Sequence, residues 1–292
     1  MSGNMGNMGN MGNLGNAFYT SGSGPSGLPD RVNLPLMEEE ASVGIVKGVV
    51  AVGAQQLKEL PGSPSPTWQP RDWDSHWTAW RVLDEFSLTK WRTITLALWN
   101  DAGNANEIKM LIKYAEDERS DALGEIVAQD AFYDHFAIYF MRLLRITTGS
   151  HPHTCALLQV AGLVGLMATM HYKANPGGGR APRVRPNQLI PALMPPVEVP
   201  GHPSFPSGHA MQSMFMALLL LEAMPGPKKA SLEPLLHTMA VRMGRNREIA
   251  GLHYPSDSDA GRDLASQLVP FLLNSADCPV FKEVLDAAKG EW

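Results

Sequence analysis

The sequence has few cysteines, no excess of basic residues and almost no strand-like alternation of polar and apolar residues. Its two cysteines, Cys155 and Cys278, lie far apart among 292 residues. They therefore make neither a disulfide framework nor a zinc site, and we expect buried free thiols. The formal net charge of −5 gives no broad positive field, which argues against nucleic acid as a partner. The lack of period-two patterns argues against a β-sheet.

The sequence also shows no secretory signal and no series of membrane spans. Its N-terminus lacks a basic stretch followed by an apolar one. A single uncharged segment, from Thr154 to Met170, approaches the length of a span, but it contains Gln159 and several small residues. A buried core helix explains this segment better. We expect a soluble, cytoplasmic protein with no integral membrane span. A homodimer is possible only on the ground that homodimers are common among soluble proteins.

Three regions are expected along the chain. Residues 1–30 begin with a Met-Gly-Asn repeat that cannot support a packed element, so a disordered tail is expected. Residues 31–75 are expected to be an N-terminal extension and linker, with a helix at 43–60 before a segment rich in proline. Residues 76–292 are expected to form the helical catalytic domain.

Helical periodicity dominates the region after residue 75. The expected fold is all-α, a helical bundle with the active site in the bundle core. Ser207 and Ser256 are expected to be helix N-caps, and Gly251 is expected to lie just past a helix end. The expected helices cover residues 76–100, 104–123, 126–146, 153–173, 207–223, 231–249, 256–274 and 279–288.

Three side-chain clusters have plain structural explanations. Trp73, Trp77 and Trp80 recur at helical spacing, and we expect this stripe to face the core. The acidic stretch 116–125 lacks the Glu-x-x-His pairs of di-iron bundles and is expected to be a solvated helix face. The pair of histidines at 151–153 precedes a helix without a partner cluster, so a surface loop is expected.

Two short segments offer groups that bind anions. In the first, Lys173 ends an apolar helix, and three glycines lead to Arg180. In the second, Ser207, Gly208 and His209 precede an apolar run, so this segment should cap a helix. The free amides of Gly208 and His209 would then lie at the positive end of the helix dipole, where oxyanions bind.

A third segment supplies a candidate nucleophile. Arg247 ends a helix, His253 lies in the following turn and Asp257 lies in the first turn of the next helix. Asp257 can accept from one ring nitrogen of His253, which fixes the tautomer and leaves the other nitrogen as a nucleophile or ligand. Guanidinium, ammonium, hydroxyl and amide donors together suit one multiply charged oxyanion without a metal cation.

Together the segments resemble the superfamily that unites type 2 phosphatidic acid phosphatases, bacterial class A acid phosphatases and vanadium-dependent haloperoxidases. The resemblance covers about residues 90–275. The family signature reads Lys-x6-Arg-Pro, Pro-Ser-Gly-His and Ser-Arg-x5-His-x3-Asp. Here it is matched by Lys173-x6-Arg180, Pro206-Ser207-Gly208-His209 and Arg247-x5-His253-x3-Asp257.

The resemblance implies a role for each matched residue. His253 would be the phosphorylated nucleophile of a phosphatase or the axial vanadate ligand of a haloperoxidase. His209 would be the acid–base residue, and Asp257 would orient His253. The oxygens of phosphate or vanadate would be held by Lys173, Arg180, Ser207, Gly208 and Arg247.

The sequence departs from the signature at the first arginine. No proline follows Arg180, whereas an Arg-Pro pair occurs at Arg185. If residues 177–179 are a local insertion, Arg183 or Arg185 takes the anion-binding role, although spacing favours Arg180. Asn246 also stands where the family often has serine.

The favoured function is a phosphoric ester hydrolase, similar to the acid phosphatases, that works through a phosphohistidine and needs no cofactor. The alternative is a vanadate-dependent haloperoxidase, which oxidises halide with hydrogen peroxide at the same site. A third class, a non-catalytic oxyanion-binding module, is disfavoured because every catalytic position is filled. The expected partners are therefore small molecules: a phosphate ester, or peroxide and halide.

Overall fold

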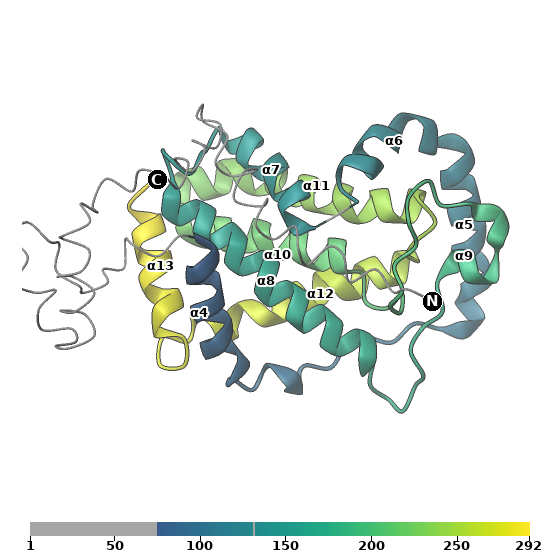
Figure 1. Cartoon of the computed structure of the whole chain (residues 1–292), viewed down its shortest axis with the longest axis horizontal. Coiled ribbons are helices and arrows are strands. Elements are labelled where there is room, and N and C mark those ends of the chain that lie inside the picture. The colour runs from purple at the N-terminus through teal and green to yellow at the C-terminus, as the bar shows by residue number, and fades with distance from the viewer. Residues whose placement is uncertain (1–74, 131) are drawn as a thin grey trace, which may run out of the picture. The chain divides into compact units, whose positions relative to one another are not determined.

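The computed structural model describes residues 75–130 and 132–292 (Figure 1). These residues form ten α-helices and three short 3₁₀ helices, and they contain no strand. The all-α prediction is therefore confirmed. The tail expected at 1–30 and nearly all of the extension expected at 31–75, including its helix and Trp73, lie outside the described residues.

The helices follow one another with short connections. The first five are α4 (Ser75–Ser87), α5 (Asn104–Asp117), α6 (Arg119–Ala128), α7 (Tyr133–Leu144) and α8 (Pro152–Ala174). The others are α9 (Pro186–Leu189), α10 (Gly208–Ala223), α11 (Gly226–Ile249), α12 (Pro255–Leu273) and α13 (Pro279–Lys289).

The prediction of one helix over residues 76–100 is wrong. Helix α4 ends at Ser87, where the hydroxyls of Ser87 and Thr89 donate to the carbonyls of Asp84 and Phe86, at 2.7 and 2.9 Å. Such local bonds offer the backbone an alternative to the helix. The expected helices at 104–123 and 126–146 are in fact three helices, α5 to α7.

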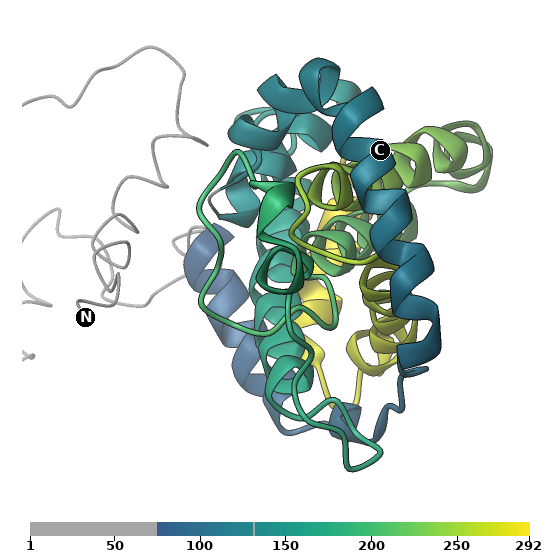
Figure 2. The same ribbon diagram turned by 90° about the vertical axis from the view of Figure 1, so that its right-hand side faces the viewer.

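Helices α8 and α10 are the centre of the core. Helix α10 packs on α8, α11 and α12, while α4 and α13 also pack on α8. Figure 1 shows α8, α10 and α12 side by side, with α5, α6 and α9 towards the right-hand end. This end faces the viewer in Figure 2. Helix α8 is long and apolar enough to cross a membrane, but most of it is buried within the protein, as expected for a core helix.

The tryptophan stripe on α4 does not face the core, contrary to expectation. Trp77 is 57% exposed and Trp80 is 42% exposed. The buried face of α4 is instead formed by Ala79, Val82 and Phe86. These residues recur with the same helical period as the tryptophans. The predicted helix is therefore confirmed here, and the predicted buried face is wrong.

Helix ends position the segments that carry the site residues. Ser207 is the N-cap of α10, and its Oγ accepts from the amide of Ala210 at 3.4 Å. Gly251 follows α11 with a φ of 76°, the left-handed conformation that ends many helices. Both predictions are confirmed. Ser256 is not an N-cap, because Tyr254 precedes α12.

Helix α12 can approach the start of α10 because Gly261 has no side chain. A Cβ at this position would lie 2.6 Å from the carbonyl oxygen of Ser207 and 3.1 Å from the amide nitrogen of Met211. Both are backbone atoms that cannot rotate away. The glycine therefore allows the first turns of α10 and α12 to meet, which brings Ser207 next to Asp257: the Ser207 amide donates to the Asp257 carbonyl at 2.9 Å.

Candidate active site

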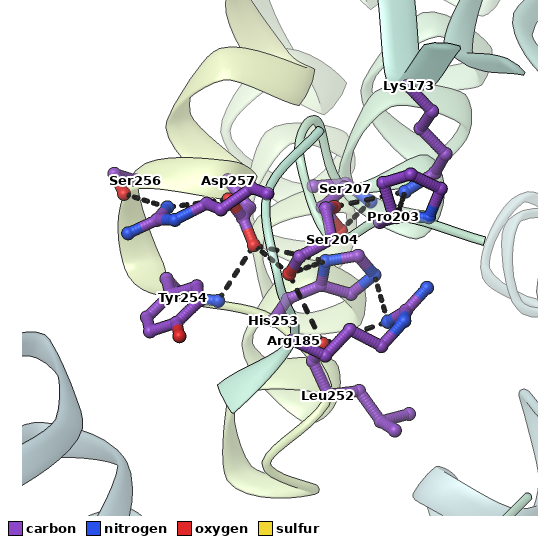
Figure 3. Close-up of polar contacts among 12 residues, drawn as sticks. Lys173, Arg185, Pro203, Ser204, Ser207, Leu252, His253, Tyr254, Ser256 and Asp257 are labelled. Carbon is purple, nitrogen blue, oxygen red and sulfur yellow. Dashed lines mark hydrogen bonds and ion pairs between the residues drawn. The ribbon is translucent and has the colours of Figure 1, made fainter. Parts of the chain in front are cut away.

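The three predicted segments meet at one buried location (Figure 3). Lys173, in the last turn of α8, donates to the carbonyls of Pro203 and Ser204 at 2.7 and 3.0 Å. Ser204 in turn contacts His253 and Asp257 through its hydroxyl. Lys173, Ser204, His253 and Asp257 are all buried, so charge here is removed from water.

His253 has different neighbours at its two ring nitrogens. Its Nδ1 lies 3.4 Å from Asp257 Oδ2 and 3.4 Å from Ser204 Oγ, while its Nε2 lies 3.4 Å from a guanidinium nitrogen of Arg185. Burial, aided by the charge of Arg185, lowers the pKa of His253 well below its usual value. A neutral ring with its proton on Nδ1, facing the carboxylate, leaves the Nε2 lone pair directed at the cationic side.

Asp257 is held by donors on both of its oxygens. Arg183 donates to Oδ1 at 2.7 Å, and the amide of Tyr254 donates to Oδ2 at 3.0 Å. Burial alone would raise the pKa of Asp257, but the hydrogen bond from His253 and the charge of Arg183 hold it at about 2. Asp257 is therefore a carboxylate at neutral pH and can orient His253.

Arg180, which the signature spacing favoured, lies away from His253 and makes other contacts. Its guanidinium pairs with Asp101 and donates to the carbonyl of Trp99 at 3.0 Å. Its side chain is 28% exposed, and its guanidinium carbon lies 4.4 Å from the centre of the Trp99 ring. The charge of Arg180 is thus matched by the carboxylate of Asp101.

Arg183 is buried, but its charge is already matched by acidic side chains. It forms ion pairs with Asp257 and Glu107, at 2.7 and 2.8 Å. It also stacks on Tyr254, with its guanidinium carbon 3.7 Å from the ring centre. Arg183 therefore ties α5 to the start of α12 behind Asp257, which leaves little charge for an anion.

Arg185 is the arginine of this segment that the structure brings to His253. It donates to the carbonyls of His202 and Leu252, at 3.0 and 2.9 Å, and to Nδ1 of His202 at 3.1 Å. It has no carboxylate in direct contact among the described residues. Burial lowers the pKa of Arg185 to about 10, so the guanidinium stays charged at neutral pH. Of the three arginines considered for this role, Arg185, which Pro186 follows, is the one that contacts His253.

Arg247 and His209 approach the site from the side of α6. Arg247 lies 3.3 Å from Asp130 and donates to the carbonyl of Ile126, but its buried Nε has no partner. His209 Nε2 lies 2.7 Å from the carbonyl of Gln129, so this nitrogen carries the proton. Burial and the charge of Arg247 lower the pKa of His209 to about 3.

The start of α10 adds neutral donors. Gly208 and His209 are in the first turn of α10, where amides have no acceptor within the helix. The Ser207 oxygen accepts from Ala210, which leaves the hydroxyl hydrogen for another partner. The charges of Lys173 and Arg185 also contribute to the lowered pKa of His209, so both cations act on the first turn of α10.

Two contacting residues were not assigned a role from the sequence. Nothing in the sequence pattern shows that the hydroxyl of Ser204 meets Asp257. The pattern likewise gives no sign that His202 contacts an arginine of the site. The structure places it on Arg185, and burial with the charge of Lys173 lowers its pKa to about 4.

The donor set suits an oxyanion and not a metal cation. No group of three potential ligands from His, Cys, Asp and Glu occurs within the part of the chain that the structure describes. The inward groups are instead Lys173, Arg185, the unpartnered Nε of Arg247 and helix amides. Such an arrangement can bind a tetrahedral anion and stabilise charge that develops on it.

Residues 153–275 match the PAP2 superfamily. The matched segment runs from the start of α8 to just beyond α12. It contains Lys173, Arg185, His209, Arg247 and His253, whereas Gln129 and Asp130 lie before it.

Proposed function

Because residues 153–275 belong to the PAP2 superfamily, a group of phosphoryl-transfer hydrolases, we propose that the protein hydrolyses phosphoric esters through a phosphohistidine at His253. One observation carries the proposal. A buried imidazole has its Nδ1 against a carboxylate and its Nε2 against Arg185, which contacts no carboxylate within residues 75–130 and 132–292. A nucleophile and an anion-binding cation are therefore adjacent.

In the first step, Nε2 of His253 attacks phosphorus and the bond from phosphorus to the ester oxygen breaks. Arg185, Lys173 and the amides of the first α10 turn hold the phosphoryl oxygens. Asp257 stabilises the positive charge that the ring gains, because the Nδ1 proton faces its carboxylate. Low exposure strengthens each of these interactions.

His209 is the proton donor to the leaving oxygen. Its pKa of about 3 in the free protein leaves it neutral, but a bound phosphate dianion adds negative charge nearby and favours the protonated ring. Its Nε2 is engaged with Gln129, so Nδ1 is the nitrogen available for the transfer. In the second step, water gives a proton back to His209 and attacks phosphorus, which breaks the bond to His253.

Vanadate fits the same donors, so the haloperoxidase remains the second candidate. The observation that favours it is His202, whose ring contacts Arg185. His202 lies in residues 200–209, a run that resembles bacterial haloperoxidase-like sequences. Vanadate bound there would supply activation of peroxide for halide oxidation. The residues of this chain would contribute the cationic contacts from Lys173 and Arg185 and the ring of His253.

The test is a trapping experiment with a matched activity assay. The protein is mixed with a radiolabelled phosphate ester, quenched in alkali and examined for an acid-labile phosphohistidine on the peptide that contains His253. We expect labelling of the wild type and none of His253→Ala, with loss of p-nitrophenyl phosphate hydrolysis. The control is His237→Ala, a histidine of α11 outside the site.

A second assay measures bromination of a dye with vanadate and peroxide. Hydrolysis that vanadate inhibits, without bromination, supports the phosphatase. Bromination that needs vanadate, with no labelled histidine, supports the haloperoxidase. Turnover retained in His253→Ala would rule out both mechanisms.

A further inference from the structure

Ser204, which the signature does not contain, contacts Lys173, His253 and Asp257. Its amide donates to the carbonyl of Arg183 at 2.9 Å, and its carbonyl accepts from Lys173 at 3.0 Å. Its hydroxyl contacts Asp257 Oδ2 and lies 3.4 Å from His253 Nδ1 (Figure 3). Its side chain is fully buried. The backbone contacts fix where the hydroxyl lies, before any substrate binds.

The hydrogen atoms of this group can be assigned from the partners. Asp257 is a carboxylate and only accepts, so the Ser204 hydroxyl donates to Oδ2. The serine oxygen then has lone pairs directed at His253, and Nδ1 lies 3.4 Å from both Oγ and Oδ2. Two acceptors, hydrogen-bonded to each other, thus face one ring nitrogen. A proton on Nδ1 satisfies both, whereas a lone pair there would face two oxygens.

We propose that Ser204 is a positioning residue, which with Asp257 keeps the proton of His253 on Nδ1 and directs Nε2 towards Arg185. This inference rests on the proposed role of His253 as nucleophile. Asp257 is itself fixed by Arg183 at Oδ1 and by the amide of Tyr254 at Oδ2, so it offers the ring one acceptor in a fixed place. The serine supplies the second point that fixes the plane of the ring.

Removal of the hydroxyl has two separable effects. Without it, Nδ1 faces one acceptor instead of two, so its proton is held less firmly and part of the neutral ring carries its proton on Nε2 instead. The imidazolium of His253 loses the same acceptor, so the acid limb of kcat/KM moves to lower pH. The ring also gains freedom to turn, so productive alignment of Nε2 becomes less frequent. Because phosphate is bound by Lys173 and Arg185 and not by Ser204, KM should change little.

The experiment compares Ser204→Ala, Ser204→Cys and Ser204→Thr. Cysteine nearly preserves the volume but bonds weakly, and threonine retains the hydroxyl. Ser213→Ala is the matched control, because it removes another fully buried serine hydroxyl, one that donates to backbone carbonyls in α10 and α11. Circular dichroism establishes folding. Heteronuclear NMR of the histidine ring nitrogens reports the tautomer of His253 without any turnover.

For Ser204→Ala and Ser204→Cys we expect a smaller Nδ1-protonated fraction of His253. We also expect kcat to fall about 10- to 100-fold, with KM within about threefold. Threonine should recover part of both, and Ser213→Ala should resemble the wild type. The inference is overturned if the alanine and cysteine variants keep the wild-type tautomer and acid limb, or if Ser213→Ala reproduces their loss. If the wild type does not hydrolyse esters, the proposed function is wrong, but the NMR test of the His253 tautomer still decides the role of Ser204 because it does not depend on turnover.

Discussion

The two sides of the site hold their cations in different ways. On the side of α8, Lys173 and Arg185 are bound by neutral backbone carbonyls and the ring of His202. On the side of α6, Arg247 is paired with Asp130. A carbonyl fixes a cation without cancelling its charge, whereas a carboxylate offsets it. The difference indicates that most of the uncompensated positive charge lies beside Nε2 of His253, where an oxyanion must bind for attack.

The largest expected effect is at Arg185. Replacement by alanine should lower kcat/KM about 1,000-fold, because a buried donor to the developing oxyanion is lost. Lysine should restore little, since it cannot reproduce the contacts of the planar guanidinium with two carbonyls and a ring. Steady-state hydrolysis of p-nitrophenyl phosphate measures both. A loss of less than about tenfold would mean that the anion binds elsewhere, and that the uncompensated positive charge beside His253 is not what binds it.

The next effect is at His209, on the α6 side. His209→Gln should lower kcat about 100-fold for an alkyl phosphate, because the alkoxide needs a proton to leave. The loss should be about tenfold for p-nitrophenyl phosphate, whose leaving group is a stable anion. The ratio of the two losses is the measurement. Equal losses for both esters would mean that His209 binds substrate and does not act as the acid.

A smaller effect of opposite sign is expected at Asp130. Asp130→Asn should strengthen inhibition by phosphate about fivefold at neutral pH, because the carboxylate that offsets Arg247 is gone. Burial raises the pKa of Asp130, so the wild-type carboxylate is neutralised as pH falls. The difference between variant and wild type should therefore shrink towards acid pH. A constant difference would show that Asp130 acts through shape and not charge.

The smallest effect is at Arg180. Arg180→Ala removes a partly exposed pair with Asp101, which should cost at most about 1 kcal/mol of stability. We expect kcat/KM within about twofold of wild type. Thermal unfolding and the same ester assay provide the two readouts. A loss comparable to that of Arg185→Ala would restore Arg180 to the site and contradict the placement of this segment.

Much of the site could be predicted because the signature ties residue types to helix ends. Ser207 as a cap, His253 in a turn and Asp257 in the next helix follow from local patterns, and the structure brings them together. The arginine could not be chosen from spacing. Arg185 is distinguished by its contact with His253 and by the lack of a carboxylate partner among the described residues. Arg180 and Arg183 form ion pairs with Asp101 and Glu107, which are distant in sequence.

The fold shows the same limit. Unbroken apolar runs located α8 and α10, whose surfaces are buried on nearly all sides. The buried face of α4 could not be assigned from the sequence, because Trp77 and Trp80 form one apolar face of the helix while Ala79 and Val82 belong to another. Close packing on α8 uses the smaller residues instead.

The most direct test is the crystal structure of the protein with orthovanadate, a mimic of the phosphoryl group in transfer. The account predicts vanadium bonded to Nε2 of His253, with vanadate oxygens in contact with Arg185, Lys173 and the first α10 amides. An anion bound beside Arg180, or one that leaves Nε2 of His253 unbonded, would contradict it.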